Sequence, residues 1–356
     1  MQVLIVKTSA FGDIVHAAPV VSYLHGACPG IEIDWLLEKP FAPLLEGHPE
    51  IRRVHRVDTK LWRQPGNLVS AAVDIHRTLR LLRHARYDVV LDLQGNSKSG
   101  LFTLASGAPQ RYGFDRSEAR EWPNLLATNR RVSISDGDLH ITERALKVAE
   151  NAFPAAPMCA SSGTLKADQR AIAAVKKKLS GSPYSSKSLV LIHPGTTWKT
   201  KCISTRFWMQ LAATLVRSNS LQLLFTWGNR RELKQVGEIT KGFTERIVVW
   251  PQVDIKELMA LISQVDLVIG GDTGPVHLAA ALGTSTLSFY RATASWRNGP
   301  RGANHITFQS SMECSPCLLK NCPQNDHCSS MNFQVQNAEE AVYNLLNKQQ
   351  EEHIST

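Results

Sequence analysis

The sequence predicts an α/β protein of two doubly wound domains, each built on a parallel sheet. Short runs rich in Val, Ile and Leu alternate with helix-length segments in both halves of the chain, which is the pattern of buried parallel strands and crossover helices. The 356 residues also exceed the size, about 250 to 300 residues, at which a single core stops growing. A stretch rich in Pro and Ser, residues 151–188, separates the two series of strands.

The apolar runs give the strands in order along each half. In the first half, strands are predicted at residues 3–6, 31–37, 51–57 and 89–93. In the second half, strands are predicted at residues 189–192, 221–227, 246–250, 266–269 and 285–290. We therefore expect an N-terminal domain at residues 1–155, a connection at 156–187, a C-terminal domain at 188–335, and a helix and tail at 336–356.

Composition and charge restrict the class of protein. With 43% hydrophobic and 20% charged residues, the chain has the composition of an ordinary globular protein. No apolar run approaches the roughly 20 residues that span a bilayer, and only four consecutive apolar residues precede Lys7, too few for a signal-peptide core. A cytoplasmic location is expected, and the net charge of +9 favours anionic partners.

Four segments are expected to carry the chemistry. In open parallel sheets the ligand crevice lies outside the carboxyl ends of the strands, and this rule selects residues 7–16, 193–201, 227–232 and 270–277. In the first segment, Asp13 opens a helix without a P-loop or a dinucleotide fingerprint around it. Its carboxylate could cap the helix or lie in its first turn, or it could act as a general base.

The segment at residues 270–277 follows a strand and opens a helix near Pro275. Free backbone N–H groups at Thr273 and Gly274, together with the positive helix end, suit a diphosphate. The alternative is a tight turn capped by Asp272. His277 lies one turn further along and, taken alone, is typical of a structural histidine.

The two remaining segments add hydroxyl and charged groups. Thr196, Thr197 and Lys201 suit phosphate oxygens, with a solvated loop as the alternative. Glu232 could accept hydrogen bonds from ribose hydroxyls or could simply lie in the first turn of a helix.

Together these segments resemble the ADP-heptose:lipopolysaccharide heptosyltransferases over essentially the whole chain. The opening Val-Leu-Ile-Val-Lys-Thr-Ser-x-x-Gly-Asp, from Val3 to Asp13, is most similar to the heptosyltransferase I members of that family. The turn Asp272-Thr273-Gly274, followed by His277, resembles the donor signature of the family and is the more specific match.

The resemblance implies a GT-B fold, in which two Rossmann-like domains face a central cleft, with the acceptor on the first domain and the donor on the second. It implies that Asp13 is the catalytic base and that Glu232 binds the ribose. Basic residues facing an acidic acceptor would be Lys60, Arg63, Arg120 and Arg144. The diphosphate and heptose would be bound by Thr196, Thr197, Lys201, Asp272, Thr273, Gly274 and His277.

The implied reaction is inverting transfer of heptose from ADP-heptose to the Kdo residue of Kdo-lipid A, in lipopolysaccharide core biosynthesis. ADP-heptose is the donor substrate, and neither a metal nor another cofactor is expected, because protein cations would neutralise the diphosphate. The expected partners are the acceptor lipid and the inner face of the cytoplasmic membrane, with peripheral attachment and no nucleic acid.

Two questions stay open at the level of sequence. Another nucleotide-sugar enzyme of the same fold, with a different heptosyltransferase acceptor or with epimerase activity, is the alternative function. The four clustered cysteines could bind structural zinc, form disulfides or remain thiols. Their spacing is Cys314-x2-Cys317-x4-Cys322-x5-Cys328.

Overall fold

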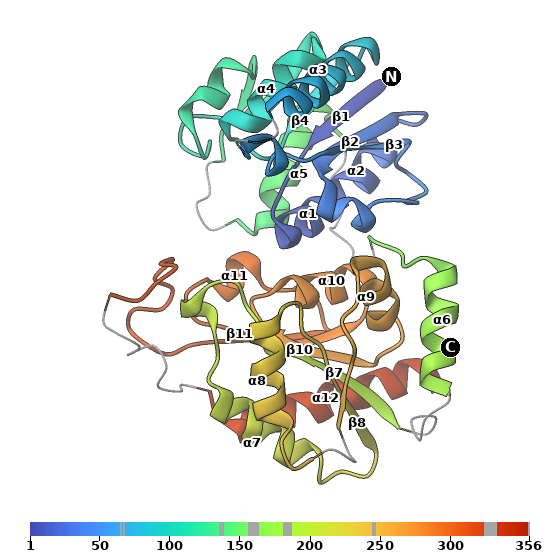
Figure 1. Cartoon of the computed structure of the whole chain (residues 1–356), viewed down its shortest axis with the longest axis vertical. Helices are drawn as coiled ribbons and strands as arrows, with labels where there is room; N and C mark the ends of the chain where they lie inside the picture. The colour runs from blue at the N-terminus through green and yellow to red at the C-terminus, as the bar shows by residue number, and fades with distance from the viewer. Residues whose placement is uncertain are drawn as a thin grey trace. The chain divides into compact units, whose positions relative to one another are not determined.

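The chain forms two compact units, Met1–Leu165 and Lys166–Thr356. The computed structural model describes residues 1–64, 66, 68–134, 139–155, 164–180, 187–243, 247–323 and 333–354. Figure 1 shows each unit as a sheet with helices on both faces. Much of the predicted connection lies outside the described residues, at 156–163 and 181–186. Its helix α6 (Gln169–Ser180) packs against α9 (Ile255–Ile262), within the second unit.

The first unit is built on a sheet of six parallel strands in the order β3-β2-β1-β4-β5-β6. The order reverses at β1, so the loops that follow β1 and β4 lie side by side at the carboxyl edge of the sheet. The strands are β1 (Gln2–Val6), β2 (Glu32–Glu38), β3 (Arg53–Val57), β4 (Val89–Asp92), β5 (Gln110–Phe114) and β6 (Arg130–Val132).

Helices cover both faces of the first sheet. Helices α1 and α2 pack with α5, whereas α3 packs with α4 and α4 packs with η4. The central strand is fully buried from Val3 to Val6, as expected for a parallel strand covered on both sides. The helices are α1 (Phe11–Ala17), α2 (Pro19–Ala27), η1 (Lys39–Leu44), η2 (Leu61–Arg63), α3 (Leu68–His84), α4 (Ser97–Ser106), η4 (Trp122–Leu126) and α5 (Ile141–Ala152).

The second unit repeats this plan with six parallel strands in the order β12-β11-β10-β7-β8-β9. Its order reverses between β10 and β7, which places the loops after these two strands next to each other. The strands are β7 (Ser188–His193), β8 (Leu221–Phe225), β9 (Ile247–Val249), β10 (Leu267–Gly271), β11 (Ser285–Tyr290) and β12 (His305–Gln309).

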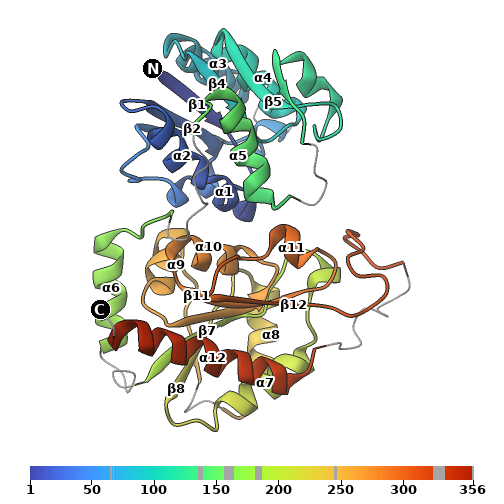
Figure 2. The same cartoon turned by 180° about the vertical axis from the view of Figure 1, so that it is seen from behind.

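The second core is rich in aromatic side chains. The rings of Phe207, Trp208 and Phe289 meet edge to face, with centroids 5.1 to 5.9 Å apart. Figure 2 shows the C-terminal helix α12 lying across this unit, where it packs on α7 and β11. The remaining helices are η5 (Lys199–Lys201), α7 (Thr205–Leu215), α8 (Arg230–Thr240), α10 (Gly274–Leu282), α11 (Ser295–Asn298) and α12 (Val335–Ile354).

The predicted fold class is confirmed, and the predicted strands that lie within the described residues are present with ends shifted by one or two residues. The predicted start of one strand, Arg246, lies outside the described residues. Three strands were not predicted, namely β5, β6 and β12. They lie at or next to the sheet edges and are only partly buried, so their sequences lack the continuous apolar runs of central strands. None of the described helices combines the length and the apolar character that crossing a bilayer requires.

Candidate active site

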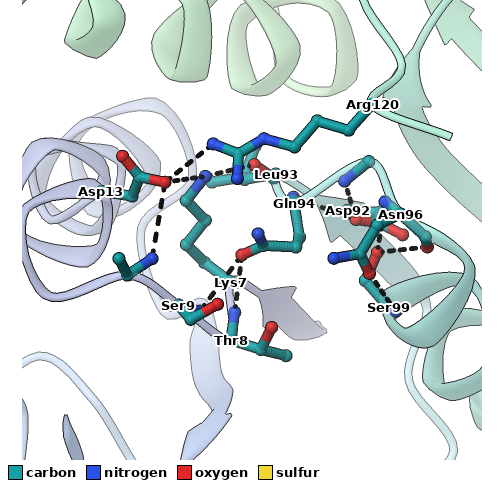
Figure 3. Close-up of polar contacts among 12 residues, drawn as sticks. Lys7, Thr8, Ser9, Asp13, Asp92, Leu93, Gln94, Asn96, Ser99 and Arg120 are labelled. Atoms are coloured by element: carbon teal, nitrogen blue, oxygen red, sulfur yellow. Dashed lines mark hydrogen bonds and ion pairs between the residues drawn. The ribbon is translucent and has the colours of Figure 1, made fainter. Parts of the chain in front are cut away.

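Asp13 lies in the first turn of α1, directly after the loop that follows β1. The residue preceding the helix is Ala10, whose N–H points to Asp13 Oδ2 at 3.4 Å. The guanidinium of Arg120 donates to the same oxygen at 2.7 Å, and Lys7 Nζ lies 4.0 Å from it (Figure 3). All three contacts therefore converge on Oδ2. No described residue donates to Oδ1, and the side chain is 23% exposed.

This arrangement keeps the Asp13 carboxylate ionised. Burial alone would raise the pKa of Asp13, but the charges of Lys7 and Arg120 outweigh it, and the pKa lies below its ordinary value. Burial lowers the pKa of Lys7 to about 8, although the charge of Asp13 opposes that shift. Near neutral pH, Asp13 is therefore an anion held between two cations.

The loop that carries Lys7 is fixed by residues that follow β4, the neighbouring strand. Lys7 Nζ donates to the carbonyl of Leu93 at 2.8 Å. The side-chain oxygen of Gln94 accepts from the N–H groups of Thr8 and Ser9 at 3.1 and 3.2 Å (Figure 3). The buried Asp92 in turn accepts from Gln94 N–H at 3.0 Å. The sequence reasoning missed Asp92 and Gln94, although the rule of strand carboxyl ends would have selected them.

The four predicted acceptor residues do not form one group. Arg120 contacts Asp13, whereas Arg144 forms an ion pair with Glu118. Lys60 is exposed just before η2, and the side chain of Arg63 lies outside the described part of the chain. Among those of the four side chains that the structure describes, only Arg120 contacts Asp13.

A lysine that the sequence reasoning missed lies at the same edge of the sheet. Lys98 Nζ is 2.7 Å from Glu38 and donates to Thr59 at 2.8 Å. It begins the helix after β4, while Glu38 ends β2 and Thr59 follows β3. Segments at the ends of three strands thus form a second polar group, Glu38, Thr59 and Lys98, and Thr59 directly precedes the predicted Lys60.

In the second unit, Asp272 is the centre of a buried charged group. Lys201 Nζ lies 2.6 Å from Asp272 Oδ2, and Thr293 donates to that oxygen at 2.5 Å. His277 Nε2 lies 2.8 Å from Oδ1. Burial alone would raise the pKa of Asp272, but the hydrogen bond and charge of His277 and the charge of Lys201 hold it far below its ordinary value.

The start of α10 is left without a side-chain cap. The residue that precedes the helix is Thr273, whose side chain accepts no hydrogen bond from the first turn. Asp272 does not cap the helix, because its carboxylate is occupied by Lys201, His277 and Thr293. The first-turn N–H groups of a helix need acceptors, so this end of α10 can bind an anion beside the Lys201 cation.

Glu232 lies in the first turn of α8 and packs against the loop that follows β7. It accepts from Gly228 N–H at 2.7 Å and from the Asn229 amide at 2.6 Å. A Cβ added at Gly195 would lie 2.4 Å from the Glu232 carboxyl carbon. Only glycine therefore permits this close approach of the loops after β7 and β8.

Thr196 and Thr197, on the loop after β7, differ in burial and in contacts. Thr196 is partly buried and donates to the Trp198 carbonyl at 3.1 Å, while Thr197 is exposed. Lys201 also lies 4.6 Å from the centre of the Trp198 ring, a cation–π contact that orients its ammonium. The structure thus joins Lys201, Asp272 and His277 directly, with Thr196 on the loop before them.

A family model described as glycosyltransferase family 9 (heptosyltransferase) matches residues 75–327. The chain belongs to this family. Lipopolysaccharide heptosyltransferase 1 of Pseudomonas aeruginosa is 32% identical to this heptosyltransferase over 323 residues, which cover 90% of this chain and 87% of the relative.

Two solved structures of the Escherichia coli heptosyltransferase WaaC resemble this heptosyltransferase in fold. The structure with ADP has a TM-score of 0.79 at 23% identity and covers 97% of this chain and 100% of its own. The structure with ADP-2-deoxy-2-fluoro heptose has a TM-score of 0.72 at 25% identity and covers 87% and 93%. The GT-B fold expected from the sequence is thereby confirmed.

The structure describes three of the four clustered cysteines of this heptosyltransferase. Cys314 is an exposed thiol and Cys317 a partly buried one, neither in a disulfide, and Cys322 is partly buried as well. Cys328 lies outside the described residues. Within the described ranges, no three His, Cys, Asp or Glu side chains are grouped closely enough to hold a metal ion.

Proposed function

We propose that this heptosyltransferase moves L-glycero-D-manno-heptose from ADP-heptose to the Kdo residue of Kdo-lipid A, with inversion at the anomeric carbon. The observation that carries the proposal is the Asp13 carboxylate, which is ionised, partly exposed and open at Oδ1. The similarity to heptosyltransferase 1 of P. aeruginosa supports the choice of acceptor, and WaaC with an ADP-heptose analogue supports the donor.

In this proposal Asp13 is the general base. An acceptor hydroxyl donates its proton to Oδ1 while its oxygen bonds to the anomeric carbon, and the bond from that carbon to the diphosphate oxygen breaks. Lys7 and Arg120 stay on Oδ2 and keep the carboxylate ionised before the transfer. ADP leaves with the electron pair of the broken bond, and the acceptor proton ends on Asp13.

The donor is assigned to the second unit. The diphosphate binds the uncapped start of α10 at Thr273 and Gly274 and contacts Lys201, whose charge opposes that growing on the leaving group. Thr196 and Thr197 contribute hydroxyls from the loop after β7. We place Glu232 on the ribose, and Asp272 and His277 on the heptose side of Lys201.

No metal or other cofactor is proposed for this chemistry, because Lys201 and the helix end provide positive charge where the diphosphate would lie. The chain contains one Asp-x-Asp triplet of a kind that can hold a metal on a diphosphate, Asp136 to Asp138, and it lies outside the described residues. Activity in the presence of a chelator therefore tests this part of the proposal.

We also propose peripheral attachment to the membrane that contains the acceptor, at its cytoplasmic face. Helices α4 and η4 pack together in the first unit and expose four large apolar side chains, each 47 to 69% accessible. Exposed Trp and Leu side chains favour the boundary between headgroups and acyl chains. The four residues are Leu101, Leu104, Trp122 and Leu126.

The acceptor is tested by assaying the purified full chain with ADP-heptose and two acceptors. Kdo-lipid A is expected to gain one heptose by mass spectrometry, whereas the same acceptor already carrying one heptose is expected to react at least about tenfold more slowly. The reverse preference would assign a different heptose addition to this enzyme and would leave heptosyl transfer itself intact. No transfer to either lipid, with ADP-heptose still bound, would exclude a Kdo-lipid A acceptor altogether.

A further inference from the structure

A pocket in the C-terminal unit is lined by residues other than those grouped around Asp272. It measures about 850 Å³ and opens between η5, the start of α7 and one side of α8. Its lining includes none of the residues assigned above to the donor. On α8 it uses Arg231, Lys234 and Glu238, which recur at helical spacing, whereas Glu232 faces the loops after β7 and β8.

The lining of this pocket is strongly positive. It contains four cations, Lys199, Arg231, Lys234 and Arg291, and a single carboxylate, Glu238, which leaves a net charge of +3. Within the described part of the chain, none of the four cations lies within 4.0 Å of a carboxylate oxygen. Like charges that outnumber their counter-charge repel one another, so a bound anion would relieve an existing cost.

Arg291 carries an unsatisfied donor at this place. Its Nη1 donates to the carbonyl of Cys202, which fixes the guanidinium at the base of η5. Its Nη2 is buried and has no hydrogen-bond acceptor among the described residues. A buried charged donor without a partner costs free energy. Because Arg291 is part of the pocket lining, a shift of its side chain toward the pocket would let an oxyanion supply the missing acceptor.

The start of α7 adds partial positive charge. Ser204 and Thr205 line the pocket and open this helix of 11 residues. The Ser204 hydroxyl accepts from Phe207 N–H at 3.2 Å, which satisfies one first-turn donor and leaves others for a ligand. The amides of Gln235 and Asn321 on the lining can donate further hydrogen bonds to an oxyanion.

We propose that this pocket binds a phosphorylated anion in addition to the nucleotide sugar. Four cations suit a group with many oxygens and more than one negative charge, such as a diphosphate, better than a single carboxylate. None of the described residues that line the pocket is aromatic, so no aromatic ring there can stack on an adenine ring. The ligand class is therefore a phosphate or diphosphate without a base, either soluble or part of a lipid headgroup.

Titration calorimetry with inorganic pyrophosphate tests the proposal on the full chain, with saturating ADP to occupy the donor site and with 150 mM salt. One further pyrophosphate is expected to bind. The double variant Arg231→Gln/Lys234→Gln should bind it about tenfold or more weakly, because two of the four cations are removed. Both side chains are exposed on α8, and unchanged melting would verify the fold. The matched control is Arg230→Gln/Lys241→Gln, which removes two exposed cations outside the pocket.

Three outcomes would overturn the proposal: no pyrophosphate binding once ADP is bound, an equal loss in the pocket and control variants, or no loss in either. Vesicles then identify the source of the phosphate. If the ligand is a headgroup, sedimentation with phosphatidic acid vesicles, but not with phosphatidylcholine vesicles, should fall in the pocket variant relative to the control. If the ligand is soluble, the pocket and control variants should sediment equally with the vesicles. Their affinities for pyrophosphate should still differ.

Discussion

Arg120 donates from Nη2 to Asp13 Oδ2 at 2.7 Å, and this contact joins the loop after β5 to the start of α1. The pair leaves Asp13 Oδ1 without a donor among the described residues. A carboxylate that is neutralised at one oxygen and open at the other can stay ionised and still accept a proton from a hydroxyl. The first two predictions follow from this geometry.

Replacing Asp13 with Asn should reduce turnover by about 10² to 10⁴-fold, because the amide keeps the shape of the side chain and loses the proton acceptor. The helix should persist, since Ala10 N–H can still donate to the amide oxygen. Steady-state kinetics, ADP calorimetry and thermal melting together check this. A variant that melts much earlier would support a purely structural first-turn role, and near-normal turnover would exclude the base assignment.

Replacing Arg120 with Gln should shift the acid limb of the pH–rate profile to higher pH. The folded-state pKa of Asp13 is depressed, with Lys7 and Arg120 as the causes that outweigh burial. Removing one cation raises that pKa, so the carboxylate is protonated, and activity is lost, at a higher pH during acidification. Arg120→Lys should restore much of the original profile. Arg116→Gln, a nearby change that does not touch Asp13, should leave the profile unchanged; a shift there would indicate a general charge effect.

Replacing Lys201 with Ala should lower kcat by about 10² to 10³-fold and weaken ADP binding much less, because charge on the diphosphate develops mainly in the transition state. The variant leaves Asp272 with His277 and Thr293 as partners, so its melting temperature must be measured as well. Lys199, two residues away on the same η5 and not in contact with Asp272, is the rival candidate, and Lys199→Ala should lower kcat less than Lys201→Ala. A loss confined to KM would indicate uniform binding of donor and transition state.

Replacing Gly274 with Val should weaken ADP binding about tenfold or more, equivalent to about 1.4 kcal/mol, because a branched side chain at the start of α10 would obstruct the diphosphate. The helix should remain, since Pro275 in its first turn and the left-handed Gly283 at its end still define it. Gly237→Ala is the control, because a Cβ there meets no atom within 4 Å. Unchanged ADP affinity in folded Gly274→Val would remove α10 from the donor site.

Chelation should leave the rate within about twofold, because Lys201 and the helix end provide the positive charge for which other enzymes use a metal ion. The measurement is initial rate before and after treatment with EDTA, with and without added Mg²⁺. The opposite result would be a strong loss of rate with EDTA that Mg²⁺ restores. If the variant Asp136→Asn/Asp138→Asn were also inactive before any chelation, the metal would be assigned to that triplet.

The sequence by itself determined the fold class, the central strands and the segments in which polar groups follow them. This was possible because strands buried on both faces must be apolar throughout, and because parallel strands end at one edge of the sheet. The edge strands β6 and β12 escaped prediction, because a partly exposed strand has no such constraint on its composition.

Only the tertiary structure decided which charged groups meet. Asp272 could have capped α10 from its position in the sequence, but folding brings Lys201 and His277 to its two oxygens and leaves the helix end open. In the same way Arg120, but not Arg144, reaches the candidate catalytic residue Asp13. The physical reason is that the strength of an ion pair depends on the distance between the two charges and on their burial. For side chains on separate loops, both quantities are set by the tertiary structure and not by the local pattern of residues.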